Sequence, residues 1–284
     1  MKVMEIRDKF AVDCLQLVER PDRGPGPGQV VRKMKAFSVN YRDLLVVNGV
    51  GRWKPPLGRI PVSDGVGIVV ATGNDVSRVR VGDRVAPIFY PNWLDGRVAG
   101  GKVALGDIRP GDSLVVLGTG GVSIFALQFA RFLGARVIVT SSSDQKLVRA
   151  KELGAAEVIN YKTDPDWPKA VMELTEDIGA DYVVDTVGGL KEAIAAVRLG
   201  GTVALVGLLI GMTSEVDLVT SMGKCARVEA VDVGSREMFE AMSKAIAFHA
   251  MRPVVDRVFG FSELREALNY LREARHFGKV CLRA

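Results

Sequence analysis

Residues 114–123, Leu-Val-Val-Leu-Gly-Thr-Gly-Gly-Val-Ser, decide the fold of this chain. A short apolar run, typical of a buried parallel strand, ends in a turn with three glycines, and an apolar helical pattern follows over Val122–Leu133. Such a strand–turn–helix directs backbone N–H groups and the positive end of the helix at one place, which suits a pyrophosphate. Ser123 replaces the third glycine of the usual fingerprint and is small enough for helix and strand to pack closely. The turn alone leaves open a purely structural role for its glycines.

Alternating strands and helices follow this turn. The predicted strands are Arg136–Thr140, Glu157–Asn160, Tyr182–Val184 and Thr202–Val206, and the predicted helices are Asp144–Leu153 and Trp167–Ile178. This order indicates a parallel sheet covered on both faces, with binding at the carboxyl ends of the strands. Three further turns fall at such ends, at residues 185–189, 207–211 and 233–236. Several turns at one edge favour a dinucleotide site.

The end of the second strand of this sheet indicates which dinucleotide binds. An acidic side chain there would accept from a ribose 2′-hydroxyl and repel a 2′-phosphate. The chain instead has Thr140-Ser141-Ser142-Ser143, with Lys146 one turn into the next helix. Hydroxyls and an ammonium suit a phosphate, so NADP(H) is favoured over NAD(H), and Asp144 is expected to help cap the helix. The alternative is that the serines only cap the helix and Lys146 is a solvated charge.

The N-terminal third has a different pattern. Val30–Phe37, Val66–Thr72 and Arg84–Phe89 resemble strands, and helical periodicity is scarce, so a compact β-rich domain is expected. Near the C-terminus, Ser262 is expected to cap a helix over Glu263–Ala274, and Lys279–Leu282 to form a last strand.

Composition narrows the class of protein. The 284 residues suit two domains, and 48% hydrophobic with 25% charged residues is ordinary for a globular protein. The net charge of +5 is spread along the chain without a basic aromatic stripe, which argues against nucleic-acid binding. No run predicts a signal peptide or a membrane span, so a cytoplasmic location without membrane association is expected. Three isolated cysteines and two histidines predict no metal site.

The order of these elements resembles the medium-chain dehydrogenase/reductase superfamily, in its zinc-independent quinone oxidoreductase-like branch. The matching segments span nearly the whole chain: Val39-Asn40-Tyr41-Arg42-Asp43, Ser63-Asp64-Gly65-Val66-Gly67, Val81-Gly82-Asp83-Arg84-Val85, 117–123, Val158-Ile159-Asn160-Tyr161, Gly234-Ser235-Arg236 and Phe277-Gly278-Lys279-Val280. The resemblance implies an α/β protein with a doubly wound parallel Rossmann sheet and a shortened GroES-like β-rich catalytic domain. The implied domains are residues 1–106 (GroES-like), 107–252 (Rossmann) and 253–284, a segment that returns to the first domain.

The same resemblance argues against zinc. Asn40 stands where metal-dependent alcohol dehydrogenases carry a ligand cysteine, and Ser63 stands where they carry a ligand histidine. Neither an amide nor a hydroxyl is a typical zinc donor. The four-cysteine structural zinc loop has no counterpart in the sequence either.

The resemblance also implies site residues. Hydride is expected to pass between the nicotinamide and a quinone, enone, aldehyde or alcohol, with the protein positioning the two reactants. Asn40, Tyr41 and Asp43 are expected on the substrate side, where Tyr41 is either a proton donor or a packing residue. The expected cofactor residues are Gly118, Thr119, Gly120, Gly121 and Val122 at the diphosphate, Ser141, Ser142, Lys146 and Tyr161 at the 2′-phosphate, Val187, Leu208 and Val233 at the ribose and nicotinamide, and Lys279, which either reaches the cofactor or is exposed.

Two features depart from the family pattern. Strands and a helix that normally line the nicotinamide pocket are missing between Asp95 and Ile108, and Val62 replaces a glycine before Ser-Asp-Gly. The shortening leaves two hypotheses: an NADP(H)-dependent oxidoreductase, which we favour, or an NADP(H)-binding protein with weak or no catalysis. Apolar alternation over Arg227–Val233 at the sheet edge predicts a homodimer or homotetramer.

Overall fold

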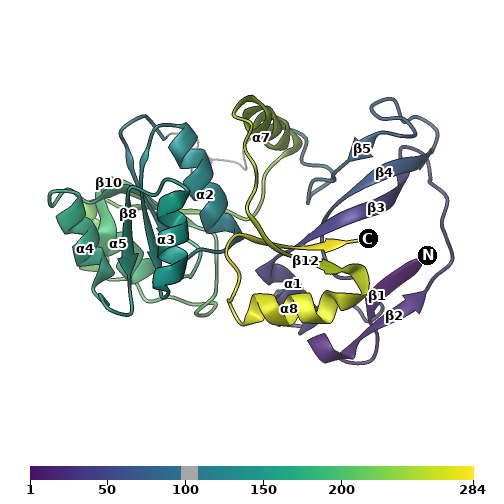
Figure 1. Ribbon diagram of the computed structural model, residues 1–284, viewed down its shortest axis with the longest axis horizontal. Helices are drawn as coiled ribbons and strands as arrows, with labels where there is room; N and C mark the ends of the chain where they lie inside the picture. Colours follow the sequence, from purple (N-terminus) through teal and green to yellow (C-terminus); the bar gives the residue numbers. More distant parts are fainter. Residues whose placement is uncertain (97–107) are drawn as a thin grey trace. The chain divides into compact units, whose positions relative to one another are not determined.

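The computed structural model describes residues 1–96 and 108–284 and forms two compact units (Figure 1). Unit 1 comprises Met1–Pro91 with Val255–Ala284, and unit 2 comprises Asn92–Val254. The junction at which the sequence places the shortening lies within 97–107, outside the described residues. Among the described helices, none is long and apolar enough to cross a bilayer.

A six-stranded parallel sheet forms the centre of unit 2, with strand order β11-β10-β9-β6-β7-β8. Its strands are β6 (Ser113–Leu117), β7 (Arg136–Ser141), β8 (Glu157–Asn160), β9 (Ala180–Asp185), β10 (Val197–Leu205) and β11 (Arg227–Ala230). The strand order reverses between β6 and β9, and loops at such a switch point are where doubly wound sheets bind ligands. We call the carboxyl ends of these strands, with the loops that follow them, the carboxyl edge. The predicted Rossmann sheet is therefore confirmed.

Helices pack around this sheet (Figure 1). They are α2 (Gly121–Phe132), α3 (Asp144–Glu152), α4 (Trp167–Leu174), α5 (Leu190–Ala196) and α6 (Leu218–Lys224). A further helix, α7 (Arg236–Phe248), follows β11 in the chain and has no buried residue. The prediction of a helix over Trp167–Ile178 was too long, because Thr175 ends α4. The Thr175 hydroxyl donates to the carbonyl of Val171 and accepts from the amide of Gly179, which turns the chain towards β9.

Unit 1 is built on a five-stranded sheet of order β12-β13-β3-β4-β5 and a hairpin, β1-β2. Its elements are β1 (Lys2–Ile6), β2 (Leu15–Glu19), β3 (Val30–Val39), α1 (Tyr41–Val47), β4 (Asp64–Thr72), β5 (Arg84–Val85), β12 (Val255–Gly260), α8 (Leu264–Arg272) and β13 (Lys279–Arg283). The last strand, β13, pairs antiparallel with β3, with Val280 opposite Val39. The C-terminal segment therefore completes the sheet of the N-terminal part of the chain.

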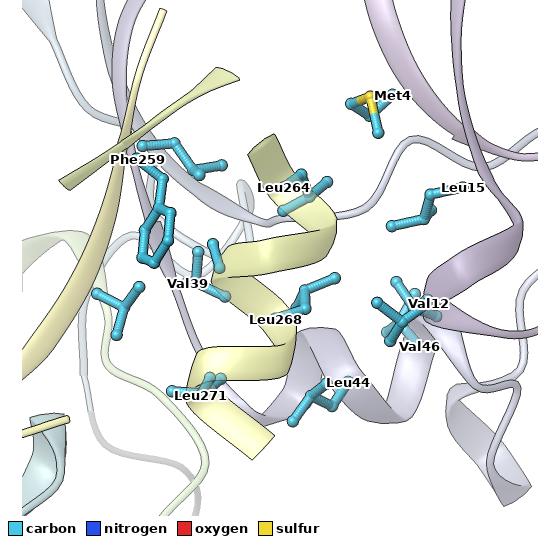
Figure 2. Close-up of a cluster of buried hydrophobic side chains, with 14 of the residues drawn as sticks. Met4, Val12, Leu15, Val39, Leu44, Val46, Phe259, Leu264, Leu268 and Leu271 are labelled. Carbon is cyan, nitrogen blue, oxygen red and sulfur yellow. The ribbon is translucent and has the colours of Figure 1, made fainter. Parts of the chain in front are cut away.

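One apolar cluster joins the helices of unit 1 to its sheets (Figure 2). Helix α8 contributes Leu264, Leu268 and Leu271, whose spacing of four and three residues places them on one face. They pack with Leu44 of α1 and Val39 of β3 in the same cluster. This packing fixes the start of α1 against the end of β3, where the candidate substrate residues lie.

Three local predictions in unit 1 were wrong. Helix α1 was not expected, since its seven residues are too short to show a clear period. The strand predicted over Arg84–Phe89 is only Arg84–Val85. Ser262 does not cap α8, because a 3-10 turn over Phe261–Glu263 precedes the helix.

Candidate functional site

The glycine turn leaves the first backbone N–H groups of α2 without a capping side chain. Gly118 has φ of +76°, a left-handed conformation that favours glycine. Gly120 is the N-cap of α2 and has no side-chain hydrogen bond at the helix start. The 12-residue α2 therefore presents unsatisfied donors and the positive end of its dipole, a donor set that fits an anionic diphosphate.

Three hydroxyls hold this turn in place. Ser123 Oγ and Thr186 Oγ1 both donate to the carbonyl oxygen of Leu117, at 2.8 and 2.7 Å. Thr140 Oγ1 accepts from the amide of Gly118 at 3.4 Å. Thr119 is buried, whereas Val122, in the first turn of α2, is 48% exposed. The turn is thus held by hydroxyls of helix α2, of strand β7 and of the loop after β9.

The end of β7 gathers the residues expected at a 2′-phosphate. Ser143, not Asp144, caps α3: its Oγ accepts from the amide of Lys146 at 3.4 Å. The predicted capping role of Asp144 is corrected, since Asp144 Oδ1 accepts instead from Asn160 Nδ2 at 2.7 Å. Ser141 is buried, and its Oγ accepts from the amide of Ser143 at 3.3 Å.

The other residues expected there lie around this strand end. Ser142 and Lys146 are half-buried. Tyr161 follows β8, donates its amide to the carbonyl of Ser141 at 3.1 Å, and is 42% exposed. The adjacent strands β7 and β8 therefore bring Ser142, Lys146 and Tyr161 to one end of the sheet.

The loops after β9 and β10 complete the carboxyl edge. Asp185 is fully buried at the end of β9, and its Oδ1 accepts from the amides of Val187 and Gly188 at 2.8 and 2.7 Å. Gly207 follows β10 so closely that a Cβ there would lie 1.7 Å from the carbonyl oxygen of Thr186. Val187 and Leu208, both half-buried, lie in these two loops. Val233, also half-buried, follows β11.

A second polar group lies in unit 1, which we call the Asn40 cluster: Asn40, Asp43, Asp64 and Lys279. Asn40 Oδ1 accepts from Lys279 Nζ at 2.6 Å, and its Nδ2 donates to Asp64 Oδ2 at 2.7 Å. The amide of Asn40 donates to Asp43 Oδ2 at 2.8 Å. Since both ends of the Asn40 side chain are engaged, it positions its neighbours. Tyr41, 39% exposed, begins α1 beside it.

Comparison with known proteins places both regions in one family. The family model for the alcohol dehydrogenase GroES-like domain matches residues 26–127, and the model for zinc-binding dehydrogenases matches residues 121–248. A zinc-type alcohol dehydrogenase-like protein of Schizosaccharomyces pombe is 34% identical over an alignment 316 residues long, gaps included. The alignment covers 90% of this chain and 91% of that protein. The chain belongs to the medium-chain dehydrogenase/reductase family.

Solved structures of this family agree with the fold. A structure from Sinorhizobium meliloti has a TM-score of 0.91 and 32% identity, covering 100% of this chain and 98% of its own. A mycobacterial protein solved with NADPH has a TM-score of 0.85 and 25% identity, covering 100% of both chains. This medium-chain dehydrogenase/reductase is an NAD(P)H-dependent oxidoreductase.

The alignment of this chain with the Schizosaccharomyces pombe relative is 316 residues long, whereas this chain has 284 residues. That relative therefore has positions without a counterpart in this chain.

The Asn40 cluster does not fit the zinc ion of the metal-dependent family members. The amide at the ligand-cysteine position is already bonded to an ammonium, whose positive charge opposes a cation. Ser63, at the ligand-histidine position, is exposed, and its Oγ lies 3.4 Å from Asp64 Oδ1. Among the described residues, no three His, Cys, Asp or Glu side chains are grouped as metal ligands. Val62, which replaces the family's glycine, has φ of +72°, so the turn before Ser63 is strained for a β-branched residue.

Burial sets the electrostatics of the Asn40 cluster. Asp43 is 1% exposed, and desolvation raises the pKa of its carboxyl to about 6, although the amide of Asn40 opposes this. Its Oδ1 is buried without a hydrogen-bond partner in the described structure. Burial lowers the pKa of the Lys279 ammonium, against the opposing charges of Asp64 and Asp43. Two groups with pKa values shifted towards neutrality lie within one cluster, an arrangement suited to proton exchange.

Several residues of both regions were missed by sequence reasoning. Asp64 and Asn160 stand within segments that match the family, and the sequence predicted no role for either. Asp185 is the last residue of the buried strand β9 and begins the predicted turn at residues 185–189, a signal that could have identified it. Thr140 was expected among the hydroxyls at the phosphate, whereas its Oγ1 accepts from the amide of Gly118. Thr186 could not be found from sequence, because its hydroxyl acts through a contact with a distant turn.

Proposed function

We propose that this oxidoreductase uses NADP(H) and transfers hydride, without zinc, between the nicotinamide and a quinone, enone, aldehyde or alcohol. The observation that carries the proposal is the uncapped start of α2 next to the hydroxyl and ammonium groups at the end of β7. The first fits a diphosphate and the second fits a further phosphate. A mycobacterial relative of the same fold was solved with NADPH, which supports this assignment.

Residues of the carboxyl edge would hold the cofactor. Gly118–Val122 would bind the diphosphate, with Thr119 buried beneath it, and Ser142, Lys146 and Tyr161 would bind the 2′-phosphate. The Ser141 hydroxyl already accepts a hydrogen bond from the amide of Ser143. Ser141 would therefore support the phosphate site by holding the Ser143 backbone in place. Val187, Leu208 and Val233 would border the ribose and nicotinamide. When bound, the nicotinamide supplies or accepts the hydride.

The Asn40 cluster would handle the proton. In reduction of an enone or quinone, one hydride and one proton must reach the acceptor. Lys279 would give up the proton, because its pKa is lowered by burial and Asn40 holds its Nζ. Water then restores the proton to the amine. Asn40 and Asp43 would position Lys279 and balance its charge, and the exposed Tyr41 would border the substrate.

The alternative of a cofactor-binding protein without turnover has no support in the structure or in the comparisons. It predicts NADPH binding without oxidation of NADPH when a quinone or an enone is added. The proposed function predicts acceptor-dependent loss of NADPH absorbance. Absence of turnover with every acceptor class, by protein that binds NADPH, would overturn the proposed activity.

Cofactor choice is tested by titrating NADPH and NADH into the protein in a calorimeter. The Lys146→Met variant is expected to weaken NADPH binding about tenfold and to leave NADH binding within about twofold. Lys169→Met, which removes an exposed lysine of α4, is the matched control and is expected to change neither. Equal affinity of the unaltered protein for both cofactors would overturn the NADP(H) assignment.

We also propose that the chain forms a homodimer or homotetramer through β11, the edge strand of the sheet among the described residues. Helix α6, which precedes β11 in the chain, exposes Leu218, Val219 and Met222 by 69%, 82% and 78%. Open strand edges and clustered exposed apolar side chains are usually covered by a partner. Light scattering should report an oligomer that the double variant Val219→Lys, Met222→Lys dissociates. A monomer at all concentrations would contradict this assembly.

A further inference from the structure

The first acidic residue after β7 is held by a neighbour on the next strand. Asp144 begins α3, three residues beyond the end of β7, and it is exposed. Its Oδ1 accepts from Asn160 Nδ2 at 2.7 Å. Asp144 is also the only acid between Thr140 and Lys146. A carboxylate at this end of the sheet would compete with the hydroxyl and ammonium groups for control of the cofactor's ribose.

Asn160 is itself fixed, so it can fix Asp144. Its Oδ1 accepts from the amide of Lys162 at 3.0 Å, which leaves Nδ2 to point at Asp144. The carbonyl of Asn160 accepts from the amides of Thr163 and Asp164, so the backbone beyond β8 is also held. An amide oriented in this way donates to Asp144 without needing to reorganise.

Asp144 is not needed for the start of α3. Ser143 is the N-cap and accepts from the amide of Lys146, whereas the Asp144 side chain bonds to β8. The Asp144–Asn160 bond therefore serves something other than helix capping. It limits the rotamers of one carboxylate that stands within one turn of Lys146 on the same helix.

We propose that Asn160 is a positioning residue for cofactor choice: it holds Asp144 away from the ribose and so favours NADP(H) over NAD(H). This inference rests on the proposed function. If the bond is lost, the Asp144 carboxylate is free to turn towards the cofactor. There it accepts from a 2′-hydroxyl and repels a 2′-phosphate.

The test measures dissociation constants for NADPH and NADH by calorimetry, in four proteins. They are the unaltered chain, Asn160→Ala, Asp144→Asn, and the double variant. Asn160→Ala is expected to lower the preference for NADPH over NADH about fivefold. This is the effect expected when one carboxylate charge moves close to the 2′-phosphate. In the Asp144→Asn background, Asn160→Ala is expected to leave the preference unchanged, because no carboxylate remains to be released.

Asn160→Ser provides a second, smaller change and should move the preference in the same direction, and thermal melting shows that each variant is folded. An unchanged preference in folded Asn160→Ala or Asn160→Ser overturns the inference. So does an equal change in the Asp144→Asn background, since Asn160 would then act on the nucleotide directly. If the unaltered protein binds neither cofactor, the proposed function fails instead, which is a different result.

Discussion

Backbone groups build the glycine turn at the carboxyl edge of unit 2, whereas side chains from separate segments build the Asn40 cluster of unit 1. At the carboxyl edge, the turn after β6 uses a left-handed glycine and an uncapped helix start. In the Asn40 cluster, an amide joins an ammonium and a carboxylate through two hydrogen bonds. The first region is therefore sensitive to added atoms, and the second is sensitive to changed charge.

The largest expected effect comes from adding one methyl group at the carboxyl edge. In Gly207→Ala the new Cβ would lie 1.7 Å from the carbonyl oxygen of Thr186, so the backbone must move. We expect the free energy of unfolding to fall by more than about 3 kcal/mol. Urea denaturation of the variant and of the unaltered chain measures this difference in the free energy of unfolding.

Gly223→Ala is the matched control, because a Cβ there meets nothing within 4 Å and lies in helix α6. Alanine in a helix is better than glycine by up to about 1 kcal/mol, so this variant should be no less stable than the unaltered chain. If Gly207→Ala is as stable as Gly223→Ala, the close approach of the two loops is not a constraint on this edge.

The same contrast explains what could be predicted from sequence. The strand–turn–helix is local, so glycine spacing and hydrophobic period identify it within about a dozen residues. The Asn40 cluster depends on pairing between β13 and β3, which brings together residues that are 239 positions apart. Sequence reasoning named Asn40 and Lys279 but expected them in different roles, because no local pattern encodes that pairing.

The next effect concerns the buried carboxyl of the Asn40 cluster. Its pKa of about 6 lies above the ordinary value of 3.8, so the folded state binds a proton more tightly than the unfolded state. The protonated Asp43 therefore contributes stability below about pH 4, and that contribution is lost as the pH rises to about 6. Between pH 4 and pH 7, the unaltered chain should lose about 2 kcal/mol of stability relative to Asp43→Asn.

Urea denaturation of both proteins across this pH range provides the measurement. The difference between them isolates Asp43, because every other titrating group is shared. A difference that stays constant with pH, or that grows in favour of the unaltered chain, would show that Asp43 is ionised in the folded state at little cost.

The third effect tests whether Lys279 donates a proton, as the Asn40 cluster suggests, or binds the cofactor, which was one of the two roles expected from the sequence. In Lys279→Met we expect kcat to fall about hundredfold, with the dissociation constant for NADPH changed by less than twofold. The alkaline limb of the pH profile should also disappear, because burial lowers the pKa of this ammonium and reduction needs its protonated form.

Lys33→Met, which removes an exposed lysine of β3, is the control and should leave kcat unchanged. The opposite outcome for Lys279→Met, weaker NADPH binding at an unchanged kcat, would assign this side chain to the cofactor. The two regions would then differ in how they are built, but both would bind the cofactor.

The smallest effect separates helix capping from phosphate binding at the end of β7. Ser143 Oγ caps α3, so Ser143→Ala should cost about 1 kcal/mol of stability and leave the NADPH dissociation constant within about twofold. Ser142→Ala should do the reverse, with NADPH binding weakened several-fold and stability kept within about 0.5 kcal/mol. Thermal melting and calorimetry on both variants give the two readouts. If Ser142→Ala leaves NADPH binding unchanged, the serines only shape the start of α3, and Lys146 and Tyr161 must recognise the phosphate without them.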